Sequence, residues 1–253
     1  MRRAYLIVVA AALILGLALV ALSVPPVLAN DNDRDGPKVF DRNSVAYGRT
    51  YSEWSAAWWQ WAFSIPVASH PLFGNGDCSI GQSGPVWFLG GRFCISGDSN
   101  CNGTATRSCT VPAGEALYFP LGNVEDSAPE EPNWGCGNNL PPLLAGTIAE
   151  MRQCAASFVN ATNLEADVDG RQIRNLSTNF RVQSVEFEVT WPSDNVLNAI
   201  GEGPFPAGTY SPVVDDGFYV LLAPLPVGNH TLHFQSGPPP NGQNITYHLT
   251  VTK

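Results

Sequence analysis

The sequence predicts a mainly β domain, an antiparallel β-sandwich or jelly roll with two inserted α-helices and disulfide-stapled loops. Three observations predict it: short stretches rich in β-branched and aromatic residues, turn residues between them, and six cysteines in 253 residues. The predicted strands cover residues 85–89, 116–120, 180–191, 210–222, 230–234 and 245–252. Many short strands with only two helices are typical of such folds. Asp169-Gly170 and Asp216-Gly217 predict hairpin turns.

Residues 1–29 have the features of a secretory signal peptide. Arg2 and Arg3 precede an apolar run over residues 4–24, and the small-residue pattern that ends at Ala29 suits cleavage there. The apolar run approaches the ~20 residues that span a bilayer, so an uncleaved anchor is the alternative, and only then would the membrane be a partner. Either way, we expect the remaining chain to be secreted or periplasmic.

The charge balance excludes some partners. The whole chain has a net formal charge of −9, although the predicted signal peptide holds two of its 13 basic residues and no acidic ones. Such a surface repels nucleic acid and anionic lipid, which leaves an extracellular polysaccharide or another polymer as the candidate partner.

The predicted mature chain divides into a flexible acidic segment, residues 30–48, and a single β-sandwich-like domain, residues 49–253. Within the segment, residues 31–36 have the D-x-D-x-D-G pattern that begins a calcium loop of the EF-hand type. The twelfth position of that loop needs a bidentate Glu, and Arg42 stands there. A flexible acidic tail is therefore the favoured interpretation.

The cysteines predict disulfides. All of them follow the predicted signal peptide, and an even number in an oxidising compartment allows three bridges in any of 15 pairings. A zinc site is disfavoured because no C-x-x-C pair is present. The cysteines are Cys78, Cys94, Cys101, Cys109, Cys136 and Cys154.

Residues 51–65 predict an amphipathic helix. Thr50 and Glu53 form a capping box at its start, and Pro66 ends it. Apolar residues recur at helical spacing between them. A second helix is predicted over residues 142–159, where the apolar residues keep the same period and Cys154 can tie the helix to a loop.

Trp54, Trp58 and Trp87 are the candidate ligand-binding residues. Exposed indole rings can stack on sugar rings, whereas large aromatic residues packed on a sheet stabilise a core. For the tryptophans of the first helix we favour core packing, because a large exposed apolar patch is rare. A sugar-stacking platform is the functional alternative.

Glu125 and Asp126 are the candidate catalytic residues. They follow the predicted strand 116–120, and two carboxylates at a strand end can act as the acid and base of a glycosidase when ~5–10 Å separates them. An acidic surface loop is the default interpretation. Residues 123–126 are nevertheless the stretch whose mutation would be most informative.

His230, His233 and His248 are the candidate metal ligands, and all lie in the last two predicted strands. Residues three apart on a strand point to opposite faces, so His230 and His233 reach one ion only if the strand is bulged. One of them with His248 and an acidic residue, Glu125 or Asp126, would suit a divalent metal. Packing of the rings across neighbouring strands is the favoured alternative, so the cofactor stays unassigned.

Several segments together resemble a family of exported bacterial proteins that has no established activity. The resemblance covers most of residues 48–252, and it implies export and one continuous domain without assigning catalytic residues. The segments that carry it are YSEW and WWQW at residues 51–61, GQSGPVW at 81–87, CTVPAG at 109–114 and LPVGNHTLHF at 225–234.

These observations favour a secreted domain that binds a ligand or a surface, with carbohydrate as the candidate ligand. Export, the acidic charge and the number of aromatic residues support it. A secreted metal-dependent or carboxylate-based hydrolase or oxidase that acts on an extracellular polymer is the first alternative. A structural component of the cell surface is the second.

Overall fold

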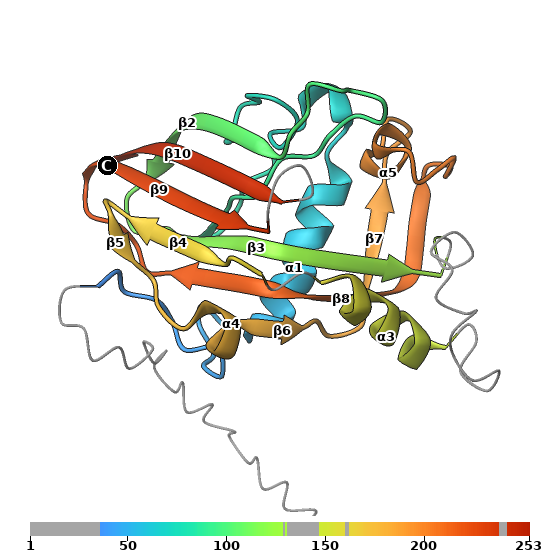
Figure 1. Cartoon of the computed structure of the whole chain (residues 1–253), viewed down its shortest axis with the longest axis horizontal. Helices are drawn as coiled ribbons and strands as arrows, with labels where there is room; N and C mark the ends of the chain where they lie inside the picture. The colour runs from blue at the N-terminus through green and yellow to red at the C-terminus, as the bar shows by residue number, and fades with distance from the viewer. Residues whose placement is uncertain (1–35, 129, 131–146, 160–161, 238–241) are drawn as a thin grey trace, which may run out of the picture.

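The computed structural model describes residues 36–128, 130, 147–159, 162–237 and 242–253. The predicted signal peptide and the first five positions of the candidate calcium loop, residues 31–35, lie outside these residues. The described chain forms two five-stranded sheets that pack as a sandwich, so the predicted mainly β class is confirmed (Figure 1). None of the described helices is long and apolar enough to cross a membrane.

The first sheet is built around two long strands, β3 (Ala116–Ser127) and β8 (Gly208–Leu222), which pair antiparallel. β1 (Val86–Phe88) pairs with β3, and both β6 (Arg181–Gln183) and β7 (Phe187–Trp191) pair with β8. The predicted strand over residues 180–191 is thus two strands, and β3 runs beyond the predicted residue 120 into the candidate acidic residues.

The second sheet has the order β2-β10-β9-β4-β5. Its strands are β2 (Thr104–Pro112), β10 (Gln243–Thr252), β9 (Gly228–Ser236), β4 (Glu165–Val168) and β5 (Arg171–Gln172). The β4–β5 turn is the predicted one at Asp169-Gly170, where both residues have positive φ.

Most strand pairs are antiparallel, but β1–β3 and β2–β10 are parallel. Each parallel pair joins strands that are separated by a long connection, as parallel pairing requires. Both sheets are therefore mixed, which corrects the purely antiparallel sandwich that the sequence predicts.

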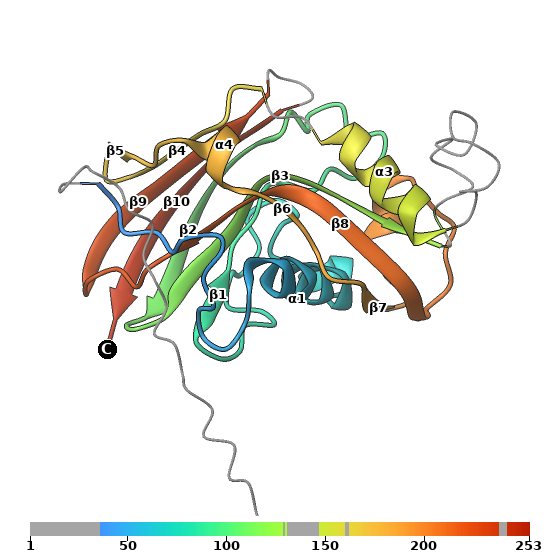
Figure 2. The same cartoon turned by 90° about the horizontal axis from the view of Figure 1, so that it is seen from below.

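Helix α1 (Tyr51–Ser64) covers one face of the first sheet (Figure 2). The predicted capping box is present, with Thr50 and Glu53 each bonding the other's backbone N–H. Ten of its 14 residues are buried, because the sheet covers one side and the loops around residues 46, 80 and 89 cover others. A helix that is apolar nearly all round is a core element, so core packing of its tryptophans is confirmed.

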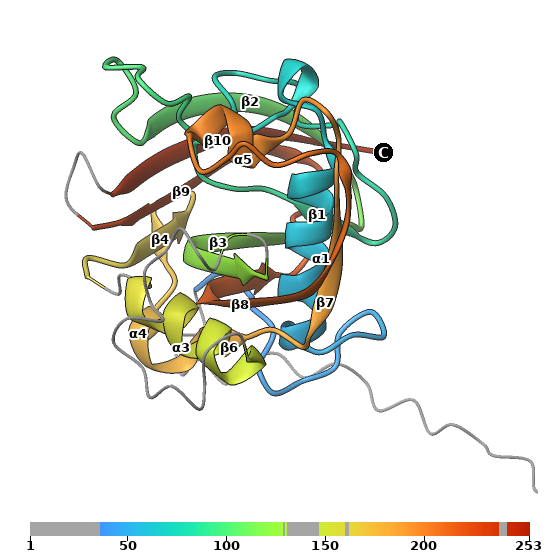
Figure 3. The ribbon, with the colours of Figure 1, turned by 90° about the vertical axis from the view of Figure 1, so that its right-hand side faces the viewer.

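Two stacks of aromatic rings fill the core on either side of β3. Phe119 stacks on Phe234 of β9 with ring centroids 5.1 Å apart, which joins the two sheets. On the α1 side, Tyr118 stacks on Tyr219 of β8 at 5.3 Å. Figure 3 shows the second sheet on one side of β3 and α1 on the other. The first sheet is thus covered on both faces.

The remaining helices of the described residues are short. They are the 3-10 helix η1 (Val67–Ser69), α3 (Ile148–Phe158), α4 (Leu176–Asn179) and α5 (Val196–Ile200). α3 lies against β3 and β8 (Figure 2) and matches the described part of the predicted helix 142–159. The residues that precede it, 142–146, lie outside the described chain. α4 and α5 are too short for a periodic pattern to reveal them.

Two disulfides are described: Cys78–Cys109 and Cys94–Cys101. Cys154 on α3 is also disulfide-bonded, and Cys136 lies outside the described residues. Cys109 lies on β2, so the Cys78–Cys109 bridge joins a turn residue to a strand. Strand β2 forms there because its alternate residues enter the core while hydroxyl side chains face water.

Two further predictions are wrong. The segment 30–48 is not wholly a flexible tail, because Val39 and Phe40 are buried and Phe40 N–H donates to the Leu221 carbonyl of β8. Asp216-Gly217 is not a turn, because it lies inside β8. Asp216 is buried and accepts two hydrogen bonds from Arg181, which permits a charged residue in the middle of a covered strand.

Candidate functional site

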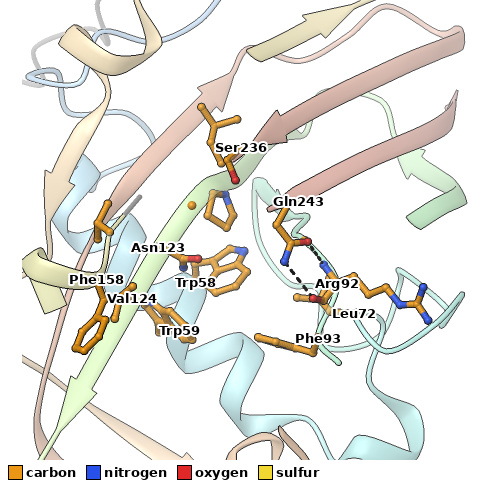
Figure 4. A pocket seen from close by; sticks show the side chains of 15 residues that line it. Trp58, Trp59, Leu72, Arg92, Phe93, Asn123, Val124, Phe158, Ser236 and Gln243 are labelled. Carbon is orange, nitrogen blue, oxygen red and sulfur yellow. Dashed lines mark hydrogen bonds between the residues drawn. The ribbon is translucent and has the colours of Figure 1, made fainter. Parts of the chain in front are cut away.

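A cleft of about 240 Å³ lies between α1, β3 and the facing ends of β9 and β10 (Figure 4). Aromatic rings form much of its lining, namely Trp58, Trp59, Phe93 and Phe158. The polar side chains that face it are neutral. The other lining residues are Leu72, Gly91, Arg92, Pro120, Leu121, Gly122, Asn123, Val124, Val159, Ser236 and Gln243.

Several parts of the chain, far apart in sequence, converge on the cleft. α1 supplies Trp58 and Trp59, and the loop before β2 supplies Phe93. β3 contributes residues 120–124, where its register with β8 shifts between Pro120 and Gly122. Such a bulge bends a strand and re-aims the side chains beside it. The facing ends of β9 and β10 and the C-terminal end of α3 complete the lining.

Gln243 fixes the loop that carries Arg92. Its side-chain oxygen accepts from Arg92 N–H at 2.8 Å, and its amide donates to the Arg92 carbonyl at 3.2 Å. The Arg92 guanidinium points away from the cleft in Figure 4 and donates to the Thr104 carbonyl. The one charged residue in the lining therefore places its charge elsewhere.

A chain of hydrogen bonds leads from the cleft to a buried carboxyl. Asn123 donates to the Tyr219 hydroxyl at 2.9 Å, and that hydroxyl donates to Asp215 at 2.7 Å. Trp59 donates its indole N–H to the same Asp215 oxygen at 2.7 Å. Gly217 permits this arrangement, because a Cβ there would lie 2.6 Å from the Cβ of Asn123. Hydrogen bonds to buried groups behind the cleft wall therefore fix the orientation of two lining residues, Asn123 and Trp59.

Asp215 belongs to a cluster of buried carboxyls, with Glu125 directly opposite it on β3 and Glu130 beside Glu125. Burial raises the pKa of Asp215 to about 7, although hydrogen bonds from Tyr219 and Trp59 oppose the shift. Burial, followed by the neighbouring carboxyl of Glu130, raises the pKa of Glu125 well above its usual range. The cluster therefore holds protons near neutral pH.

Neither candidate catalytic residue lines the cleft. Glu125 and Asp126 are 3% and 0% exposed, respectively, and they follow the lining residues Asn123 and Val124. As consecutive residues of β3 they point to opposite faces of the first sheet. The acidic surface loop expected for them is wrong, because β3 continues through both.

The candidate ligand-binding tryptophans are core residues. Trp54, Trp58 and Trp87 are exposed by 6%, 2% and 6%, so none offers an open ring face to solvent. The indole N–H of Trp54 donates to Ala46 and that of Trp58 to Leu89. Trp58 nevertheless lines the cleft, and Trp54 lines a second hollow together with Arg49 and Trp61.

The three candidate metal ligands are not brought together. His233 of β9 and His248 of β10 share the outer face of the second sheet, and His230 has the opposite parity. His230 bonds Asp169 at 2.7 Å, and His233 bonds Asp167 at 3.1 Å. No group of three or more His, Cys, Asp or Glu side chains in the described residues is arranged to hold a metal.

Sequence reasoning missed most of the cleft. Trp59, Phe93, Ser236 and Gln243 come from segments far apart in the chain, and no local pattern marks them. The Asn123-Val124 pair is the exception, since it belongs to residues 123–126, the stretch that the sequence identifies as the most informative to mutate. The polar end of a strand that is otherwise apolar was the signal.

Comparisons with known proteins do not assign the cleft. No protein-family model matches this sequence, and no curated protein matches it. A solved structure titled "Solution Structure of Amebosin" is 10% identical and covers 67% of this chain and 100% of its own. Its TM-score is 0.21, which is too low to support an argument about fold or function.

Proposed function

We propose that this protein is an exported binding protein whose cleft holds one ring-sized, neutral unit of a ligand, a carbohydrate. The observation that carries the proposal is the cleft lining, which combines the half-buried ring of Phe93 and the exposed ring of Phe158 with neutral polar side chains, those of Asn123, Ser236 and Gln243. Sugars match this combination because their ring faces are apolar and their rims carry hydroxyls. Disulfides accord with an oxidising compartment.

The size of the cleft limits the ligand. At about 240 Å³ it is smaller than the ~300–1,000 Å³ of pockets for drug-sized molecules. A single ring fits this volume, so one residue of a longer saccharide would enter while the rest stays outside. Phe158 at the rim is 51% exposed and is placed to contact that outer part.

The absence of charge in the lining sets the specificity. With the Arg92 guanidinium directed away, an ionised ligand would lose its hydration without gaining a partner, which is costly. Neutral sugars can exchange water for the free oxygen of Asn123 and the hydroxyl of Ser236. We therefore expect neutral saccharides to bind and uronic acids to bind at least tenfold more weakly.

The test is calorimetric titration of the mature protein with neutral mono- and oligosaccharides and with their uronic acid counterparts. Val124→Phe places a ring in the cleft and should weaken binding at least tenfold. Val227→Phe is the matched control, because Val227 is 55% exposed and lies outside the cleft lining. The proposal fails if no neutral saccharide binds, or if both variants bind as the parent does.

A further inference from the structure

The outer face of the second sheet carries a regular array of polar side chains. Strands β2, β10 and β9 alternate, with apolar residues directed inward and polar ones outward. We call the outward set the polar grid. Its members are Thr104, Thr106, Ser108 and Thr110 of β2, Asn244, Thr246, His248 and Thr250 of β10, and Asn229, Thr231, His233 and Gln235 of β9.

The strand registers align these side chains in rows. One row is Thr106, Thr246 and His233, and the next is Ser108, His248 and Thr231. Neighbouring strands lie ~4.8 Å apart, and successive outward residues on one strand lie ~6.7 Å apart. The polar grid therefore repeats in two directions.

The inner side of the same strands holds the polar grid in place. Arg107 is the one basic residue of β2, and it points inward, where its guanidinium donates to the carbonyls of Leu72, Gly74 and Gly90. Its neighbours on the inner side are buried apolar residues. Threonine side chains have few rotamers, so a fixed backbone also fixes their hydroxyls.

The hydroxyls of β2 are available to a ligand. Within the part of the chain that the structure describes, the hydroxyls of Thr104, Thr106, Ser108 and Thr110 make no hydrogen bond to another protein group, and all four residues are exposed. Each hydroxyl can donate and accept. The polar grid itself contains no Asp, Glu, Lys or Arg, although the chain as a whole has a net charge of −9. Charged side chains border it: Glu165 and Asp167 of β4 lie beside Gln235 and His233, and Arg92 bonds the Thr104 carbonyl.

We propose that the polar grid is a docking surface for a neutral polysaccharide chain. Hydroxyls and amides complement sugar hydroxyls, and the imidazole rings of His233 and His248 offer faces for stacking. The polar grid itself offers an anionic polymer no Lys or Arg, and the carboxylates of Glu165 and Asp167 on the adjoining β4 repel such a polymer. Because neighbouring strands are rotated by about 20–25°, the surface is twisted, and a flexible chain can follow it where a flat crystal cannot.

This proposal uses residues other than the cleft, so it stands or falls separately. The probes are three neutral polysaccharides in amorphous, insoluble form, cellulose, chitin and β-1,3-glucan, and one anionic polymer, polygalacturonate, immobilised on beads. Depletion of the mature protein from solution measures binding. We expect retention by at least one neutral polymer and none by polygalacturonate.

The test variant is the triple substitution Thr106→Ala, Thr110→Ala and Thr246→Ala, which should weaken retention at least tenfold. Thr106→Val with Thr246→Val is the second variant, since valine keeps the β-branched shape without the hydroxyl. The matched control is Thr190→Ala with Thr209→Ala, a bonded hydroxyl pair on the outside of the first sheet. The control should bind within twofold of the parent.

Four outcomes would overturn the proposal. They are no retention by any neutral polymer, unchanged retention of both test variants when their urea midpoints match the parent, retention by polygalacturonate alone, and loss of retention in Val124→Phe but not in the test variants. Concentration-dependent dimerisation that the triple variant abolishes would instead assign the polar grid to a second copy of this chain, and that result also counts against it.

Discussion

The two sheets of this protein differ in how many of their faces are covered. In the first sheet, every residue from Val213 to Leu222 of β8 is buried, because α1 packs on one side and α3 and the second sheet pack on the other. In the second sheet, β2 alternates strictly between exposed and buried residues. Coverage on both faces removes the alternation that marks a strand, whereas coverage on one face preserves it.

The same difference decides where each kind of polar residue lies. The first sheet holds carboxyls inside, at Glu125, Asp126, Asp215 and Asp216, each 3% exposed or less. The second sheet keeps most of its polar side chains outside, where water satisfies them, and its buried Arg107 is instead paired with backbone carbonyls. Buried carboxyls cost free energy unless they are protonated or paired, so we expect the stability of the first sheet to be the more sensitive to mutation and to pH.

The largest expected effect comes from a large-to-small change under the first sheet. Trp58 is 2% exposed and packs against Trp59 at 5.0 Å and Trp61 at 5.8 Å between ring centroids. Trp58→Ala should lower the free energy of unfolding by about 3–5 kcal/mol, because it removes apolar contacts and leaves a cavity. Urea unfolding followed by circular dichroism measures the loss.

Thr106→Ala on the outer face of the second sheet is the comparison for Trp58→Ala. It should change the free energy of unfolding by no more than about 0.5 kcal/mol, because the site is exposed. If Trp58→Ala fails to fold, Trp58→Phe serves as the milder variant and should still cost more than Thr106→Ala. Equal losses at the two sites would contradict the difference in coverage.

The sequence predicts the fold best where local signals are complete. The capping box at Thr50 and Glu53 and the proline at 66 predict α1 to within one residue. The Asp169-Gly170 turn is correct because both residues adopt positive φ between two short strands. Asp216-Gly217 is the same dipeptide but lies inside β8. Arg181 pairs with the buried aspartate there, and Gly217 leaves room for the side chain of Asn123. Only tertiary contacts distinguish the two cases.

The candidate site was less predictable than the fold. Strand β2 was missed because its residues read as a loop, with Ser and Thr at alternate positions and Arg107 among its inward ones. The cleft needs Trp59 and Gln243, which are far apart in sequence, and neither belongs to a motif. Individual residues can be recognised as unusual from the sequence. Strand order decides which of them come into contact, and no local pattern specifies that order.

A second effect should appear in the pH dependence of stability. The folded-state pKa of Asp215 is raised to about 7 from an ordinary value of 3.8, so the folded protein holds a proton that the unfolded chain releases. The stabilisation is complete below pH 3.8 and is lost as the pH rises to about 7. The slope from this one group is about −1.4 kcal/mol per pH unit within that window.

The titration of His70 makes stability depend on pH in the opposite direction to that of Asp215. The experiment therefore needs a control variant that keeps His70. Its pKa is lowered to about 4 by burial, so stability is lost as the pH falls from 6.5 towards 4. Comparison with Asp215→Asn cancels this contribution, since His70 is unchanged. We expect the parent's free energy of unfolding to decline relative to that of Asp215→Asn between pH 4.5 and 7. Parallel curves over that range would refute the proton on Asp215.

The smallest expected effect on the free energy of unfolding comes from mutation at the exposed start of α1. It tests whether stability is sensitive to mutation throughout the region of the first sheet or only in its interior. The Thr50 side chain accepts from Glu53 N–H at 3.3 Å, at an exposed position. Thr50→Ala should cost about 1 kcal/mol, the usual value of a lost N-cap, as measured by urea unfolding. Glu53→Gln should cost less, because glutamine also completes a capping box. If Thr50→Ala lowers the free energy of unfolding as much as Trp58→Ala does, the end of α1 matters as much to the packing of the first sheet as its buried face. The covering of both faces of the first sheet would then not be enough to explain how the two sheets differ.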